Sequence, residues 1–177
     1  MGDWPRDTTL SRTTITNAGG LGCIAGQNNL ASAAGMGSAV WPAANRAIFV
    51  AFDVEVPSLA QRMFFNVVTQ SGNYDIGLYT ESGARLVSVG STAVPAGGFA
   101  NVDIADTALA PGTYFMALCV DNTTASFTRS GPAAELLRVC GVQQQALGAV
   151  TLPNPATFAN PASAYMPLLG VSLVATV

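Results

Sequence analysis

Three carboxylates in the second half of the chain have the spacing best suited to chemistry. Asp103 and Asp106 lie three residues apart near the end of an expected strand, and Asp121 follows a later one. Two carboxylates about 5 Å or about 6.5–9.5 Å apart would hydrolyse a glycoside, whereas calcium needs about six oxygen ligands. The simpler interpretation is that Asp106 and Thr107 cap a turn. We favour the turn, and we predict no catalytic, cofactor-binding or metal-binding residue.

The composition omits the usual catalytic groups. The chain contains no His, and all seven of its basic residues are Arg. Without His it lacks the most frequent general base and the commonest zinc ligand. Its cysteines, Cys23, Cys119 and Cys140, are odd in number and have no paired spacing, which argues against a disulfide framework. We therefore expect a protein that is not an enzyme and that uses no cofactor.

Charge is sparse in this sequence. Only 10% of the 177 residues are charged and the net charge is −3, whereas soluble domains average about 25% charged residues. The scattered Arg residues form no basic patch, so we expect no nucleic-acid partner. No run of about 18 apolar residues occurs, so we expect no membrane span. Either other subunits cover much of the surface, or the composition is simply biased toward Ala and Gly. We favour covered surface and a homo-oligomer.

The elements that must position these residues are strands. In the segment from Asn73 to Tyr79, the side chains alternate between two faces, with Tyr74 on the face expected to be buried and Asp75 on the other. The expected core of this and a second alternating strand consists of Tyr74, Ile76, Leu78, Tyr114, Met116 and Leu118. Other strands are expected at 46–54, 61–69, 85–89, 99–104, 126–129 and 165–174. Turns recur about every ten residues, which predicts an all-β, antiparallel, jelly-roll-like sandwich.

The chain divides into two regions by composition. Residues 1–44 are rich in Gly, Ala, Ser, Thr and Asn, and we predict an extended N-terminal arm there. Residues 45–177 form the sandwich domain. Within it, 131–163 is expected to be irregular apart from a short helix at 133–139, which follows a Gly-Pro pair. The closing strand, 165–174, is expected to return beside the first strands.

Seven large apolar side chains have no obvious place in this core. Those in the arm are too far apart to build a core of their own, so they suit pockets on a partner. Those in the sandwich lie opposite the core-facing side chains, where a ring would pack on a subunit or stack on a sugar. The predicted partner-binding residues are Trp4, Ile15, Met36, Trp41, Phe64, Tyr79 and Phe115.

A pattern of turns and strands also resembles a known group of proteins. It comprises Asp75-Ile76-Gly77-Leu78-Tyr79, then Gly83 to Leu86, then Pro111-Gly112-Thr113-Tyr114. This pattern resembles small β-sandwich virion proteins of tailed bacteriophages, of the head-decoration or tail-fibre type. It is also similar to secreted bacterial β-sandwich modules that bind sugars or accompany peptidases.

The resemblance implies a non-enzymatic structural protein located in a virion. It would be an exterior capsid decoration or cement protein, or a tail-associated protein, that binds other virion proteins, with a trimer as the expected homo-oligomer. The alternative is a glycan-binding receptor-recognition module of a tail fibre or tail tip. A third hypothesis, a carboxylate hydrolase, requires two converging acids. A glycan binder should instead show outward aromatic rings, and a structural protein should show large subunit contacts.

Overall fold

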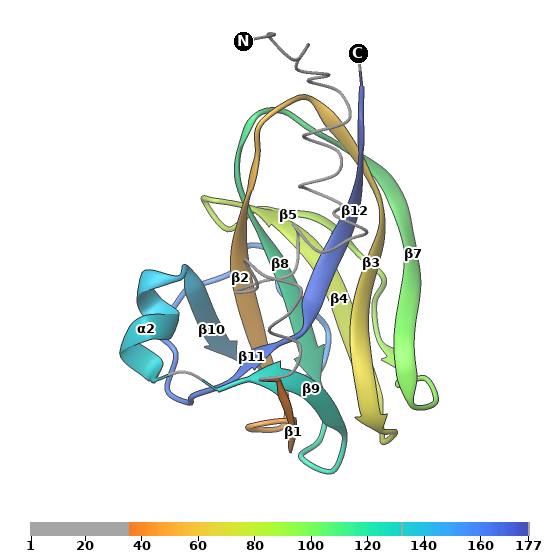
Figure 1. Ribbon diagram of the computed structural model, residues 1–177, viewed down its shortest axis with the longest axis vertical. Coiled ribbons are helices and arrows are strands. Elements are labelled where there is room, and N and C mark those ends of the chain that lie inside the picture. The colour runs from red at the N-terminus through yellow and green to blue at the C-terminus, as the bar shows by residue number, and fades with distance from the viewer. Residues whose placement is uncertain (1–35, 132, 177) are drawn as a thin grey trace, which may run out of the picture.

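The computed structural model describes residues 36–131 and 133–176. These residues form two antiparallel sheets packed face to face, with one short helix, α2 (Ala134–Val139), among the described elements. Figure 1 shows β12 next to β3, with β7 at one margin of the view. The expected all-β sandwich is confirmed, and the expected helix forms within one residue of its predicted bounds.

Sheet A contains the three strands that carry the candidate binding surface. Its order is β1, β9, β3 and β12, with β7 on β3 and β11 on β9. The bounds are β1 (Gly37–Val40), β3 (Ser58–Thr69), β7 (Gly98–Leu109), β9 (Ser126–Ser130), β11 (Met166–Pro167) and β12 (Leu169–Ala175). β12 pairs with the first part of β3 and β9 with its end, so the closing strand does return beside an early strand.

Sheet B is built around two paired strands, β4 and β8, which were predicted from their alternation. Its order is β10, β2, β8, β4 and β5, with β6 also on β4. The bounds are β2 (Arg46–Val54), β4 (Asn73–Thr80), β5 (Arg85–Ser88), β6 (Thr92–Ala93), β8 (Gly112–Val120) and β10 (Val142–Ala146). Consecutive strands repeatedly cross from one sheet to the other, from β2 to β3, β3 to β4 and β7 to β8, as they do in jelly rolls.

The main core lies between the sheets and contains the alternating side chains of both. Of the six predicted core residues, all but one are buried; Tyr114 is half-buried and packs against the margin of the core. Its hydroxyl donates a hydrogen bond to the carbonyl of Ala110 (3.0 Å), which closes the turn before β8. The alternation therefore identified the buried face of β4 and β8 correctly.

The N-terminal limit of the sandwich differs from the prediction. β1 pairs with β9, and Trp41 is fully buried, with edge-to-face contacts to Phe127 (5.6 Å between ring centroids) and Tyr165 (5.3 Å). The indole Nε1 donates to the carbonyl of Arg46 (2.9 Å), which satisfies its one polar group. The expected boundary at residue 44 is therefore wrong, because the sandwich already includes Gly37. Residues 1–35, with the predicted anchors Trp4 and Ile15, lie outside the described residues.

Candidate binding surface

The outer face of sheet B is covered by a later segment of the same chain. Residues 147–159, which we call the strap, lie over it and bury a second apolar cluster. The ring of Phe158 contacts Phe49 (5.1 Å) and Phe115 (4.6 Å), and Phe49 contacts Tyr79 (5.2 Å). The members of the cluster are Ala47, Phe49, Tyr79, Phe115, Ala117, Cys119, Val150, Leu152 and Ala156. This face is therefore a second core rather than a free surface.

Asp75 fixes the strap to sheet B. Its side chain is fully buried, although the alternation predicted an outward position. One carboxylate oxygen accepts hydrogen bonds from the backbone N–H of Gly90 (2.9 Å) and the hydroxyl of Ser88 (2.9 Å). The other oxygen accepts one from the backbone N–H of Leu152 (2.8 Å), 77 residues along the chain. A buried carboxylate needs such donors to offset its desolvation, and here they join β4, β5 and the strap.

The other outward positions of β4 serve the same purpose. A Cβ on Gly77 would lie 2.3 Å from the carbonyl oxygen of Val87, so only Gly permits the close approach of β5. The hydroxyl of Tyr79 donates to the carbonyl of Pro153 in the strap (2.6 Å). The Arg85 guanidinium donates to the carbonyl of Leu152. In the pattern Asp75-Ile76-Gly77-Leu78-Tyr79, the Asp, Gly and Tyr residues therefore attach the strap and β5 to β4.

Burial under the strap also suppresses the reactivity of two ionisable groups. It raises the pKa of the Cys119 thiol to about 12, and the nearby carboxylate of Asp75 adds to the shift. Burial likewise raises the pKa of the Tyr79 hydroxyl, although Arg85 partly opposes the effect. Cys119 is therefore held as a neutral thiol, as expected for a small apolar core residue.

Three predicted partner-binding residues are buried by this chain itself. Tyr79 and Phe115 lie beneath the strap, and Trp41 lies in the main core. The prediction that they contact a partner is wrong, because the sequence pattern could not show that residues 147–159 cover them. Met36 is half-buried at the start of the described chain. Phe64 alone among the predicted sandwich residues lies on a face that the described residues leave open.

That open face is the outer side of sheet A. Met63, Phe65 and Val67 of β3 point into the core, so the side chains between them point outward. We define the open face by the outward residues of β3, β7 and β12, which are Gln61, Arg62, Phe64, Asn66, Val68, Phe99, Asn101, Asp103, Asp106, Gly170, Ser172 and Val174. Most of them are exposed or half-buried within the described part of the chain.

Aromatic and aliphatic side chains lie across the open face. Phe64 is opposite Gly170 in the β3–β12 pairing, and a Cβ on Gly170 would lie 2.1 Å from the Phe64 ring. The ring therefore lies over the glycine and across the strand pair. Phe99 on β7 is 69% exposed, and Val68 and Val174 are 49% and 47% exposed. Large apolar groups exposed on neighbouring strands are typical of a contact surface.

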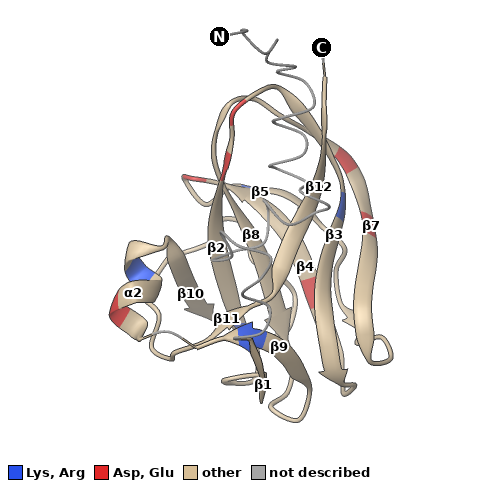
Figure 2. Ribbon diagram, in the orientation of Figure 1, with Lys and Arg blue, Asp and Glu red and all other residues tan. Residues whose placement is uncertain are grey.

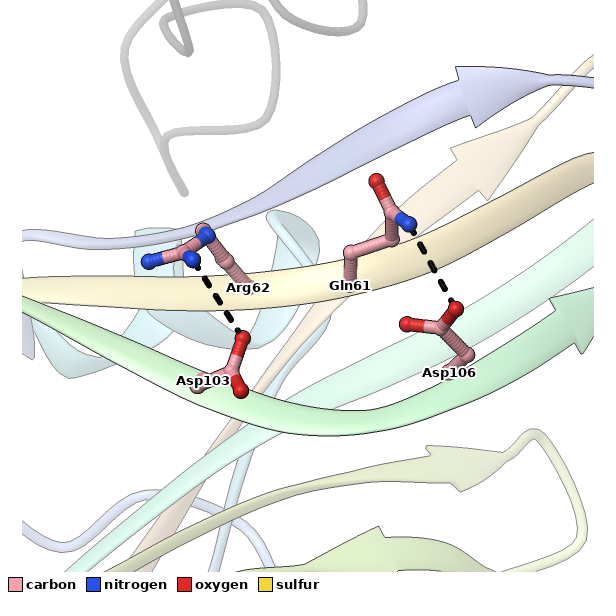
Figure 3. Close-up of polar contacts among 4 residues, drawn as sticks. All are labelled: Gln61, Arg62, Asp103 and Asp106. Atoms are coloured by element: carbon pink, nitrogen blue, oxygen red, sulfur yellow. Dashed lines mark hydrogen bonds and ion pairs between the residues drawn. The ribbon is translucent and has the colours of Figure 1, made fainter.

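Two polar pairs, drawn in Figure 3, lie along β3 between the positions of Phe64 and Val174. Arg62 lies 3.5 Å from Asp103 in an ion pair, and the amide of Gln61 donates to Asp106 over 3.4 Å. Both pairs link β3 to β7, and both are solvent-exposed, so each contributes little stability. Figure 2 shows how few other charged residues lie near them on the described ribbon. Each carboxylate of Asp103 and Asp106 therefore has a cross-strand partner, and the expected turn cap at Asp106 is instead a position within β7.

The third candidate carboxylate lies away from this surface. Asp121 follows β8 and accepts hydrogen bonds from the side-chain amides of Asn73 (2.9 Å) and Asn122 (2.6 Å). Burial by itself would raise its pKa, but hydrogen bonds from the Asn73 backbone and from both amides outweigh this and lower it. The three acids thus do not converge. No group of three potential metal-binding side chains occurs within 36–131 and 133–176.

The loop after β8 also explains the Asn122-Thr123-Thr124 sequence, which matches a glycosylation sequon. The carbonyl oxygen of the Asn122 side chain accepts hydrogen bonds from the backbone N–H groups of Thr124 (2.8 Å) and Ala125 (2.8 Å). Its amide donates to the carbonyl of Ser71 (3.1 Å). Both ends of the side chain are engaged, so Asn122 shapes the loop rather than presenting a free amide.

Comparisons with known proteins give little further information. No protein-family model matches the chain, and no curated protein matches it. The chain aligns with a solved structure at 11% identity and a TM-score of 0.48. That structure contains the cysteine protease and lectin-like domains of Cwp84, a surface-layer-associated protein of Clostridium difficile. The alignment covers 75% of this chain and 32% of that one, so this chain spans about a third of its length. No helix in the described residues is long and apolar enough to cross a membrane.

Proposed function

We propose that this protein is a non-enzymatic structural component of a tailed-phage virion and that it binds neighbouring subunits through the open face of sheet A. The observation that carries the proposal is the contrast between the two outer faces. Sheet B is sealed by the strap, whereas sheet A presents Phe64, Phe99 and Val68, with polar side chains between this group and Val174. Exposed aromatic and aliphatic groups together with polar side chains are the usual composition of a protein interface.

The low charge of the whole chain supports the same function. With 10% charged residues, the protein has little to keep isolated copies apart in solution. Neighbouring subunits would cover the exposed apolar groups, while the exposed pairs of Arg62 with Asp103 and Gln61 with Asp106 would set the orientation of the contact. The virion setting and the trimer rest on the resemblance to small phage β-sandwich proteins.

A second candidate function is glycan binding by a receptor-recognition module. It is favoured by one observation: the exposed ring of Phe99 lies between Asn66, directly opposite it on β3, and Asn101, two residues along β7. A ring that stacks on a sugar, beside amides that bond its hydroxyls, would suffice for a shallow glycan site. We rank this function second because the other exposed large groups of the open face, Val68 and Val174, are aliphatic.

The test is to follow the protein into particles. Mass spectrometry of purified virions should detect it at a fixed copy number, and Phe99→Ser should reduce that number at least tenfold. Val139→Ser is the matched control, because Val139 is 85% exposed on α2 and lies outside the open face. Absence of the wild-type protein from virions would refute the virion function. Saturable binding of a glycan that is lost in Phe99→Ser, with copy number unchanged, would establish the alternative.

A further inference from the structure

We propose that the open face of sheet A receives residues 1–35 of a second copy of this chain. This inference rests on the proposed function, since it names the neighbouring subunit and the part of it that binds. It assigns an occupant to the patch formed by Phe64, Phe99, Val68 and Val174, and it makes the contact mutual, because each copy both gives and receives one segment.

The surface itself indicates a peptide-like occupant. Its apolar groups are distributed across three adjacent strands, β12, β3 and β7, rather than gathered into one deep site. Strands in a sheet lie about 4.8 Å apart, so the patch is on the order of 10 Å wide. The Phe64 ring lies over Gly170. Polar side chains of β3, β7 and β12 lie between the apolar groups, so the open face is a narrow strip with large apolar groups at intervals, which fits a segment of chain with occasional large side chains.

The N-terminal segment has the matching chemistry. It carries Trp4, Leu10, Ile15 and a few further large apolar residues among Gly, Ala, Ser and Thr, too far apart to build a core. Its charges, Asp3 and Asp7 with Arg6 and Arg12, cancel, so its net charge does not repel the mixed charges of the open face. That face carries one Arg and two Asp side chains, for which the two Arg residues of the segment are suitable partners.

The segment also has the reach, and it starts from a favourable place. It joins the described chain at Met36, directly before β1, which lies at the edge of sheet A opposite to β7. β1 and β7 are separated by three strand spacings, or about 15 Å. Thirty-five extended residues span up to about 115 Å. The segment can therefore extend well beyond its own sheet to the open face of an adjacent copy, and such exchange links copies through a tether.

The decisive experiment is photo-crosslinking of the full-length chain from position 99. Phe99→p-benzoylphenylalanine places the probe on the open face, and Val139→p-benzoylphenylalanine is the control on α2. Equal amounts of ¹⁴N- and ¹⁵N-labelled chains are mixed, irradiated and digested, and the cross-linked peptides are identified by mass spectrometry. We expect position 99 to capture peptides from residues 1–35, with mixed isotopic pairs that show capture from a second copy, and position 139 to capture none of them.

The other outcomes separate this inference from the proposed function. Mixed-isotope capture of peptides from residues 36–177 would overturn the inference while leaving the open face a subunit contact. Capture of residues 1–35 only within one chain would overturn exchange between copies. No capture at position 99, together with a monomeric mass in light scattering, would refute both.

Discussion

Asp75→Asn isolates the contribution of a single buried carboxylate, and its effect can be worked out from the contacts. Wild-type Asp75 offers two acceptor oxygens, one to the N–H of Gly90 and one to the N–H of Leu152. Asparagine has the same shape but replaces one oxygen with an NH₂ group, which then faces an N–H donor. One charge-assisted hydrogen bond is lost (about 1.5–3 kcal/mol) and one buried N–H is left unsatisfied (about 1–3 kcal/mol), so we expect a loss of about 2.5–6 kcal/mol.

The assay is equilibrium urea unfolding at neutral pH, with Asp106→Asn as the control. Asp106 is exposed and accepts one long hydrogen bond from Gln61 (3.4 Å), so its substitution should change the free energy of unfolding by no more than about 0.5 kcal/mol. Hydrogen exchange adds a local measurement, because the Leu152 amide should lose protection in Asp75→Asn. A loss below about 1 kcal/mol with the Leu152 amide still protected would refute the view that Asp75 fixes the strap.

Four further predictions follow from the same contacts. Leu118→Ala should lower the free energy of unfolding by about 2–5 kcal/mol in urea titrations, because it leaves a cavity in the main core. Gly77→Ala should destabilise by at least about 2 kcal/mol, since its Cβ would meet backbone; a near-wild-type melting curve would contradict this. The folded pKa of Asp121 lies below its ordinary 3.8, so its stabilising contribution is present above pH 3.8 and is lost as the pH falls through the folded pKa. In Asp121→Asn, the free energy of unfolding should therefore fall less steeply as the solution is acidified. Finally, iodoacetamide at pH 8 should label the exposed Cys140 in the native protein but Cys119 only after unfolding, as read by peptide mass mapping.

The sequence predicted the fold well wherever alternation was clear. β2 was predicted with its observed bounds, and the bounds of β4 and β8 were correct to one residue, because their buried faces carry large apolar side chains at every second position. β10 was missed, since the run Gln143-Gln144-Gln145 has no apolar alternation and pairs only as an edge strand of sheet B. β1 was missed because Gly37 and Ser38 give no strand signal before Trp41.

The candidate surface was harder to predict than the fold. Phe64 was identified because it opposes the core-facing residues of its strand, and the same argument failed for Tyr79 and Phe115. Alternation reports which side chains share a face but not whether a distant segment covers that face. Phe99 was not singled out, although its place beside Ala100 in the expected strand made it outward-facing. The residues that attach the strap were visible as a motif, yet their partners lie about 70 residues away and have no local sequence signal.

The strap has a consequence for the order in which the domain can complete its fold during synthesis. Sheet B acquires its last central strand, β8, by residue 120, but the segment that seals its outer face ends near residue 159. Until that segment leaves the ribosome, the rings of Phe49, Tyr79 and Phe115 have nothing from their own chain to cover them. At about 5–20 residues per second, the intervening 39 or so residues take on the order of 2–8 seconds to synthesise. During that interval the outer face of sheet B is apolar and uncovered, so the nascent chain can aggregate or be bound by chaperones.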